Sequence, residues 1–178
     1  MQKDEVKRIA ESLLFVHAHP LGLDSIRKIL GNEVEKKVIR EALEELFAEY
    51  REMGRGYHLV EVGEGYQFRT RPEYAVWIGR LRKVRPIKLS QPALETLAIV
   101  AYRQPIVRSE LEQIRGVDSG WVLHSLLEKG LIKILGRKEV PGRPLVYGTS
   151  KRFLEVFGLR DVKGLPTLQE LESLKDNR

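Results

Sequence analysis

Histidines are the residues of this sequence best suited to chemistry, and their spacing assembles no familiar site. The four are His17, His19, His58 and His124, and cysteine is absent. His17 and His19 are separated by one residue, a spacing at which two histidines can bind one metal ion, but no third ligand follows at a zinc-site spacing. No phosphate-binding glycine loop, His-Glu-x-x-His sequence or serine nucleophile motif is present. We therefore expect no metal, no cofactor and no catalytic residue, and a small hydrolase or metalloenzyme is a distant third interpretation.

Hydrophobic periodicity predicts three helices and a hairpin in the first 82 residues. Apolar residues recur at helical spacing over 4–18, 24–30 and 32–52. Two strand-like runs, 57–62 and 66–70, are separated by Gly-Glu-Gly, as in a tight hairpin. Three helices followed by a hairpin are typical of a winged helix, and a further short helix follows the hairpin.

The same order of elements repeats in the second half of the chain. A helix begins at Ser90 and ends at Pro105, Ser109 and Glu112 form a predicted capping box for the next, and a third begins near Asp118. A second hairpin follows, with a longer wing. Phe68, Thr70 and Gly79 match Tyr147, Thr149 and Gly158 at an offset of 79 residues. We predict a mainly α fold with small β-wings (α+β), consisting of two tandem winged-helix domains joined by a short basic linker.

Charge distribution separates a DNA-binding from a protein-binding winged helix. The net charge is +6, but residues 32–52, the predicted third helix, hold four basic and seven acidic residues. DNA phosphates would repel such a helix. The corresponding second-half helix, 118–129, has one lysine against two acids and carries Trp121, Val122 and Leu123 at its start. We expect protein contact, with DNA bound at most weakly and non-specifically by the basic linker or the second wing.

A winged-helix DNA-binding transcriptional regulator remains the alternative. It would bind DNA with a steep dependence on salt, through Lys36, Lys37 and Arg40. Acidic residues interrupt the apolar N-terminal stretch, which excludes a signal peptide or a membrane anchor there. Together with the absence of cysteine, this predicts a cytoplasmic protein with no membrane partner.

Several stretches resemble the segregation and condensation protein B (ScpB) family, over essentially the whole chain. They are LETLAIVAYRQPIVRSELEQIRGV, LLEKGLI, GRKEVPGRPLVYGTS, RFLEVFGL and the late Leu165-Pro166, and the most specific parts are 102–105 and 142–149. The resemblance implies a non-enzymatic accessory subunit of the bacterial SMC condensin complex, acting in chromosome condensation and segregation. It also implies a homodimer formed through the N-terminal domain, and binding to the kleisin ScpA, which connects the subunit to SMC at the nucleoid.

The expected division is a dimerising winged helix (1–82), a linker (83–89), a partner-binding winged helix (90–160) and a tail (161–178). Candidate dimerisation residues are apolar residues expected outside the core of the first domain, namely Phe15, Val16, Leu21 and Leu23. The candidate partner-binding residues are Tyr102, Arg103, Trp121, Arg143, Leu168 and Leu171.

Each partner-binding candidate also has a structural interpretation. Tyr102 can pack on the core while Arg103 caps helix carbonyls. Arg143 can orient its turn or pair with a carboxylate or phosphate. Trp121 is either a core residue, the usual outcome for tryptophan, or an exposed anchor. The tail has a capping box at Thr167 and Glu170 and leucines three apart, and is too short to hold a helix without docking on its own domain or on a partner.

Overall fold

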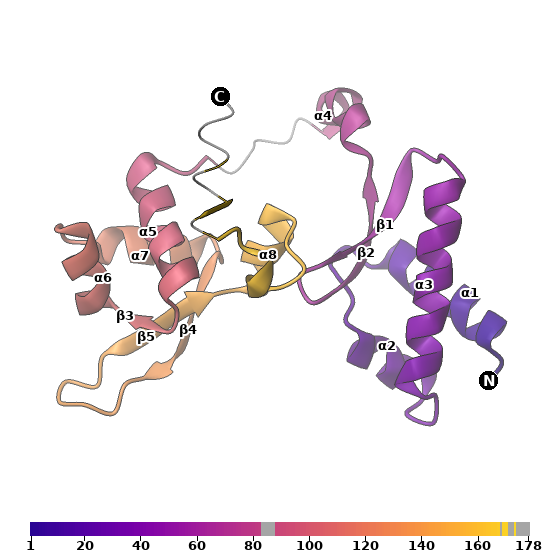
Figure 1. Cartoon of the computed structure of the whole chain (residues 1–178), viewed down its shortest axis with the longest axis horizontal. Coiled ribbons are helices and arrows are strands. Elements are labelled where there is room, and N and C mark those ends of the chain that lie inside the picture. The colour runs from indigo at the N-terminus through magenta and orange to yellow at the C-terminus, as the bar shows by residue number, and fades with distance from the viewer. Residues whose placement is uncertain (83–87, 168, 171–172, 174–178) are drawn as a thin grey trace. The chain divides into compact units, whose positions relative to one another are not determined.

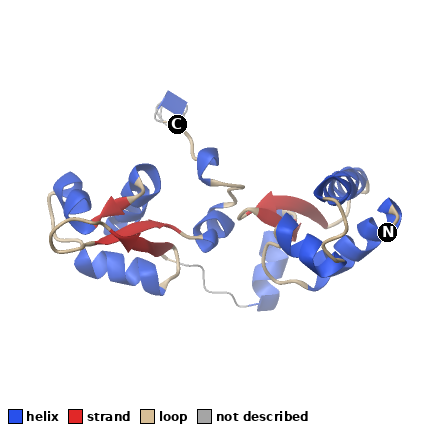
Figure 2. Cartoon of the chain, turned by 90° about the horizontal axis from the view of Figure 1, so that it is seen from below, coloured by secondary structure: helices blue, strands red, loops and turns tan. Residues whose placement is uncertain are grey.

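A computed structural model describes residues 1–82, 88–167, 169–170 and 173. It confirms the expected fold class, mainly α with small β-wings, and each unit carries its own strands covered by helices (Figures 1 and 2). The chain forms two compact units, one of residues 1–85 together with 158–178 and one of residues 86–157. Leu168 and Leu171, and residues 83–87 of the expected linker, lie outside the described residues.

The first unit is a three-helix winged helix with a two-stranded wing. Its elements are α1 (Lys3–Val16), α2 (Leu23–Leu30), α3 (Lys36–Glu52), β1 (Tyr57–Val62), β2 (Gly65–Thr70), the 3-10 turn η1 (Pro72–Tyr74) and α4 (Ala75–Arg82). The apolar faces of the first three helices meet in a core whose fully buried side chains include Leu14, Ile26, Ile39, Leu43 and Leu46. Burial of these side chains is the main force that holds the three helices together.

The wing of the first unit closes through a two-residue turn. β1 and β2 pair antiparallel up to Val62 opposite Gly65. The turn residues Gly63 and Glu64 both have positive φ, +59° and +61°, the conformation that suits a tight hairpin. Leu21 and Tyr66 exchange backbone hydrogen bonds beside this turn, and a Cβ on Gly65 would lie 2.8 Å from the carbonyl carbon of Leu21. Glycine is therefore required at position 65.

A late segment of the chain completes this wing. The N–H groups of Gly63 and Glu64 donate to the carbonyl oxygens of Leu159 and Arg160, both at 2.9 Å. The Arg160 guanidinium lies 3.3 Å from the carboxylate of Glu61. We call residues 158–161 the clasp. The compact units differ here from the expected division, which assigned residues 158–160 to the second winged helix.

The second unit is a winged helix with a three-stranded sheet. Its elements are α5 (Gln91–Arg103), β3 (Ile106–Val107), α6 (Arg108–Arg115), α7 (Gly120–Glu128), β4 (Ile132–Arg137), β5 (Leu145–Thr149) and α8 (Lys151–Phe157); a 3-10 turn, η2 (Val162–Gly164), follows the clasp. The sheet order is β3-β5-β4, all antiparallel. Leu97, Leu111, Leu123, Leu126, Leu131 and Phe153 form much of its core.

The start of α6 differs from the sequence-based prediction. The Glu110 carboxylate accepts a hydrogen bond from the Val107 N–H at 3.2 Å, so the start of the helix is capped from one side by Glu110, and the predicted reciprocal pair of Ser109 and Glu112 does not form it. The reason is the short strand β3, which ends at Val107 and leaves the helix to begin at once. In the tail, by contrast, Thr167 and Glu170 make the predicted reciprocal hydrogen bonds, at 2.6 and 3.3 Å.

Candidate protein-binding surfaces

The turn between α6 and α7 satisfies its own polar groups. Gly116 ends α6 with a φ of +72°. The Glu112 carboxylate accepts the Ser119 N–H at 2.9 Å and lies 2.6 Å from the Arg108 guanidinium, which also pairs with Asp118. The Ser119 N–H, and then Arg108, hold the pKa of Glu112 below its ordinary value. These contacts fix the geometry of the helix-turn-helix.

Three apolar side chains stand exposed on this helix-turn-helix. They are Ile114 near the end of α6, Val117 in the turn and Trp121 at the start of α7, each more than half exposed. We call them the helix-turn-helix patch. A DNA-reading winged helix normally presents Arg, Lys, Asn or Gln from its third helix. Here α7 contains no Lys or Arg, and its first exposed side chain is an indole.

Trp121 is the candidate for which the structure changes the expectation most. Burial was the expected outcome, but Trp121 is 77% exposed, whereas Val122 next to it is buried. Helical periodicity explains the difference, because Val122, Leu123 and Leu126 face the core and leave Trp121 on the other side of α7. The structural interpretation of Trp121 is therefore wrong, and its side chain is available to a partner.

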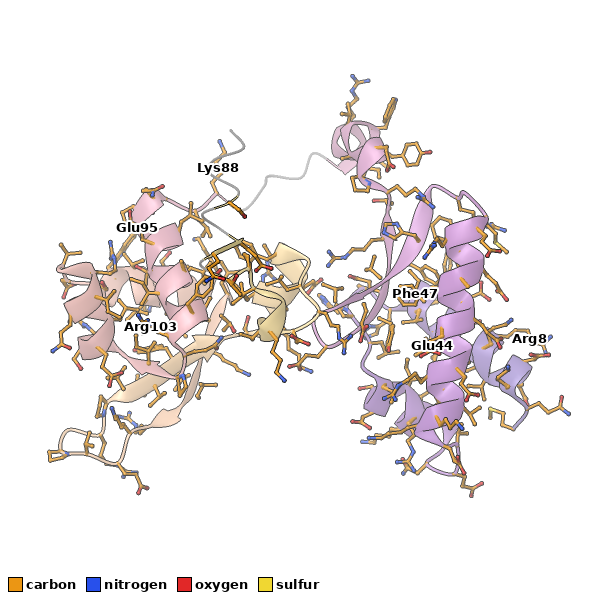
Figure 3. All side chains as sticks on the ribbon, viewed as in Figure 1. Arg8, Glu44, Phe47, Lys88, Glu95 and Arg103 are labelled. Atoms are coloured by element: carbon orange, nitrogen blue, oxygen red, sulfur yellow. The ribbon has the colours of Figure 1, made fainter. Side chains whose placement is uncertain are left out.

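The end of α5 is organised by Gln104, for which the sequence indicates a structural role without naming its contacts. The Gln104 amide donates to the Ala101 carbonyl at 3.1 Å, and its oxygen accepts from the Thr149 N–H at 2.8 Å and the Thr149 hydroxyl at 3.0 Å. The carbonyl cap expected of Arg103 is thus made by Gln104. Arg103 is exposed at the end of α5 (Figure 3), and Tyr102 is 43% exposed rather than packed inside.

Arg143 shapes the second wing through its backbone. Its φ is +39°, its N–H donates to the Val140 carbonyl at 2.9 Å, and its own carbonyl accepts from the Arg137 guanidinium at 3.0 Å. These contacts all involve the backbone of Arg143; its side chain is exposed, so both interpretations of the guanidinium stay predictions. Tyr102, Trp121 and Arg143 lie on three different elements: the end of α5, the start of α7 and the wing.

The dimerisation candidates of the first unit divide into two groups. Phe15 and Val16, at the end of α1, are 75% and 77% exposed, outside the core as expected. Leu21 is only 7% exposed, so the expectation that it lies outside the core is wrong; its backbone bridge to Tyr66 holds it inside. Leu23 is half-buried against the same core. Val16 also lines a shallow groove along α1, together with Arg8, Ile9, Ser12 and Leu13.

The first unit has a further exposed apolar surface, on η1 and α4. Tyr74, Val76, Trp77 and Leu81 are all exposed, and the rings of Tyr74 and Trp77 lie 6.3 Å apart. The repeat aligns Tyr74 with Phe153, yet Phe153 is buried in its own unit. Sequence periodicity gives no signal for this difference, because both segments read as short apolar helices after a strand.

Within the described ranges, no helix is long and apolar enough to cross a membrane. The same residues bring together no group of three His, Cys, Asp or Glu side chains that could hold a metal ion. His17 Nδ1 lies 2.6 Å from the backbone oxygen of His19, so one ring nitrogen of the alternating pair is engaged by the backbone.

These two winged-helix units, with an apolar helix-turn-helix in place of a basic one, define a class of winged-helix protein suited to binding other proteins. The chain belongs to the family described as segregation and condensation complex subunit ScpB, which it matches over residues 8–168. It is 51% identical over 174 residues to segregation and condensation protein B of Syntrophotalea carbinolica, covering 98% of this chain and 87% of that protein. The corresponding protein of Moorella thermoacetica is 44% identical, with 98% and 88% covered.

Two solved structures are also similar in sequence. The crystal structure of ScpB from Mycobacterium tuberculosis is 33% identical, covers 89% of this chain and 98% of its own, and has a TM-score of 0.42. A crystal structure of a dimer of the ScpB N-terminal domain complexed with ScpA peptide is 33% identical, covers 44% of this chain and 95% of its own, and has a TM-score of 0.39.

Proposed function

We propose that this chain is a non-enzymatic accessory subunit of a bacterial SMC–kleisin complex. It dimerises through its first unit, binds the kleisin ScpA, and reaches SMC through the kleisin, acting in chromosome condensation and segregation in the cytoplasm, at the nucleoid. Membership of the ScpB family supports this role. The single observation that carries the binding proposal is the exposed Trp121 on the helix-turn-helix patch.

The surroundings of the patch have the anatomy of a protein interface. Interfaces tend to have an apolar centre with aromatic anchors and a polar rim. Ion pairs flank the patch, since Arg108 pairs with Glu112 and Asp118, and Arg115 lies 3.4 Å from Glu95. Because these charges are already paired, they form a rim that needs no ion from the partner. An apolar segment of the kleisin is the occupant that such a surface favours.

Replacing Trp121 tests kleisin binding. Trp121→Ala removes an anchor without touching the core, and we expect ScpA affinity to fall by about tenfold or more, measured by isothermal titration calorimetry. Ile134→Ala, an exposed apolar change on β4 of the same unit, is the matched control and should bind as the parent does. Unchanged affinity in a Val117→Ala, Trp121→Ala double variant would overturn the assignment.

Phe15 and Val16 are the residues proposed to form the dimer. Two adjacent apolar side chains that are three-quarters exposed are costly to leave in water and are typical of an interface. Phe15→Glu with Val16→Glu should convert the dimer to a monomer in light scattering, with an unchanged circular dichroism spectrum. Ile29→Glu, at an exposed apolar position on α2, should leave the dimer intact. A dimer that survives the double change would show that another surface forms it.

A DNA-reading role for α3 is less favoured. Lys36 lies 2.5 Å from the Asp24 carboxylate, and Lys37 lies 3.9 Å from that of Glu41. Both lysines thus have an acidic side chain beside them, on a helix with an excess of acid. Tight and sequence-selective duplex binding that is lost in Lys36→Ala, Lys37→Ala would reverse this ranking.

A further inference from the structure

A hollow of about 830 Å³ lies in the first unit, between α3, the wing and the clasp. Its apolar lining is Leu23, Phe47 and Tyr66, and the rings of Phe47 and Tyr66 meet edge to face at 6.1 Å. Its polar lining comes from three separate segments of the chain. We call this hollow the wing pocket; its residues lie outside the helix-turn-helix patch and the end of α1.

Acidic groups outnumber basic ones in the wing pocket. The carboxylates are Glu44, Glu61, Glu64 and Asp161, and the cations are Arg40 and Arg160. The Arg160 guanidinium is shared between Glu61, at 3.3 Å, and Asp161, at 3.7 Å. Within the part of the chain that the structure describes, the side chain of Glu44 makes no hydrogen bond or ion pair. A negative charge therefore stands at the rim without a neutralising contact.

The Tyr66 side chain reaches into this charged environment. Burial raises the pKa of its hydroxyl, Glu61 raises it further, and Arg40 and Arg160 oppose that rise. The hydroxyl makes no hydrogen bond to any described residue. It is thus available to a ligand, beside an aromatic surface and an unpaired carboxylate. Figure 3 labels Glu44 and Phe47 close together on α3, so one occupant can reach both.

We propose that the wing pocket docks a partner segment in which an arginine or lysine adjoins apolar side chains. The cation lies against Glu44, and the apolar side chains cover Phe47 and Tyr66. Charge complementarity selects this occupant, since four carboxylates against two cations disfavour an anionic segment and repel DNA phosphates. This is a second docking site, separate from the one proposed for the kleisin on the other unit.

A tripeptide probe tests the proposal on the full-length protein by NMR titration. The probe is N-acetyl-Phe-Leu-Arg-amide, compared with its citrulline counterpart, which has nearly the same shape without the charge. We expect saturable chemical-shift changes at the amides of Glu44, Glu61 and Tyr66. The citrulline peptide should bind with about tenfold lower affinity, because it lacks the charge-assisted hydrogen bonds. The peptide with glutamate in place of arginine should bind with still lower affinity.

Matched variants locate the site. Glu44→Lys should lower the affinity for the arginine peptide by about tenfold, because it replaces an attractive charge with a repulsive one. Glu52→Lys makes the same charge change at an exposed position on the same helix, away from the pocket, and should bind as the parent does. Equal affinity for the arginine and citrulline peptides, saturation at other residues, no saturable shift, or no effect of Glu44→Lys would each overturn the proposal.

Discussion

The side chain of Gln104 connects the end of α5 to β5 through hydrogen bonds, and removing it should lower the stability of the second unit. Gln104→Ala leaves the Thr149 N–H and the Ala101 carbonyl without their partner, so the second unit should lose about 1–3 kcal/mol. Urea unfolding followed through amide resonances of the second unit measures this loss. Gln113→Ala, at an exposed position on α6, is the control and should stay within about 0.5 kcal/mol. Equal midpoints for the two variants would contradict the role of Gln104.

Glu112 makes the stability of the second unit depend on pH. Its folded pKa lies below the ordinary value of 4.5, first because of the Ser119 N–H and then because of Arg108. A lowered folded pKa stabilises the fold above the unfolded pKa, and that contribution is lost as the pH falls through the folded pKa. Glu112→Gln should therefore reduce the loss of stability on acidification below about pH 5, measured by urea unfolding at several pH values.

The control for this pH dependence is Glu139→Gln, at an exposed position in the second wing. It should keep the full acid dependence of the parent protein. If Glu112→Gln and Glu139→Gln lost stability equally on acidification, Glu112 would not be the group responsible.

At the scale of elements, two glycines of the first unit should respond in opposite ways to alanine. Gly65→Ala places a Cβ 2.8 Å from the Leu21 backbone and should cost about 1–3 kcal/mol. Gly79, within α4, has open space where a Cβ would lie, with no atom within 4 Å, so Gly79→Ala should be neutral or stabilise by up to about 1 kcal/mol. Urea unfolding followed through the first unit measures both. A Gly65→Ala protein as stable as Gly79→Ala would show that Leu21 and the turn can separate freely.

The clasp should protect the tip of the first wing. In a chain that ends at Phe157, the N–H groups of Gly63 and Glu64 lose their acceptors on Leu159 and Arg160. Hydrogen exchange at these two amides should accelerate by about tenfold or more, because their protection depends on this local contact. The Leu21 amide, bonded to the Tyr66 carbonyl, is the internal control and should exchange as before. Unaltered exchange at Gly63 and Glu64 would show that the clasp does not hold the turn.

Elements with a local signal were predictable from the sequence, and those that depend on distant contacts were not. Apolar spacing and glycine turns predicted the main helices and both hairpins, which the structure contains. The strand β3 has only two residues, and it exists because β5 pairs with it from about 40 residues away. The clasp on the first wing is likewise a contact between segments almost 100 residues apart. Neither β3 nor the clasp produces a periodic pattern of apolar residues, so neither could be predicted from the sequence.

The candidate surfaces show the same division between local and distant information. Phe15 and Val16 were expected outside the core and lie there, but the backbone bridge that buries Leu21 was not visible in its flanking residues. The exposure of Trp121 follows from the helical phase of α7, which becomes certain only once Val122 and Leu123 are seen to face inward. The wing pocket combines residues from α2, α3, the hairpin and the clasp, so no single sequence motif predicts it.

At the scale of the whole molecule, the two units suit an assembly subunit better than a DNA reader. The third helix of the first unit is acidic, and that of the second presents an exposed tryptophan and no Lys or Arg. Such surfaces favour protein partners over phosphates. Membership of the ScpB family agrees with this interpretation of the charges.

The most direct test of the proposed function is size-exclusion chromatography with light scattering on the full chain, alone and mixed with ScpA. We predict a homodimer that forms a larger, stable complex with the kleisin, and changing Trp121 to alanine should weaken this complex. A monomer that does not bind ScpA, and that binds a particular DNA duplex tightly at physiological salt, would contradict the proposal.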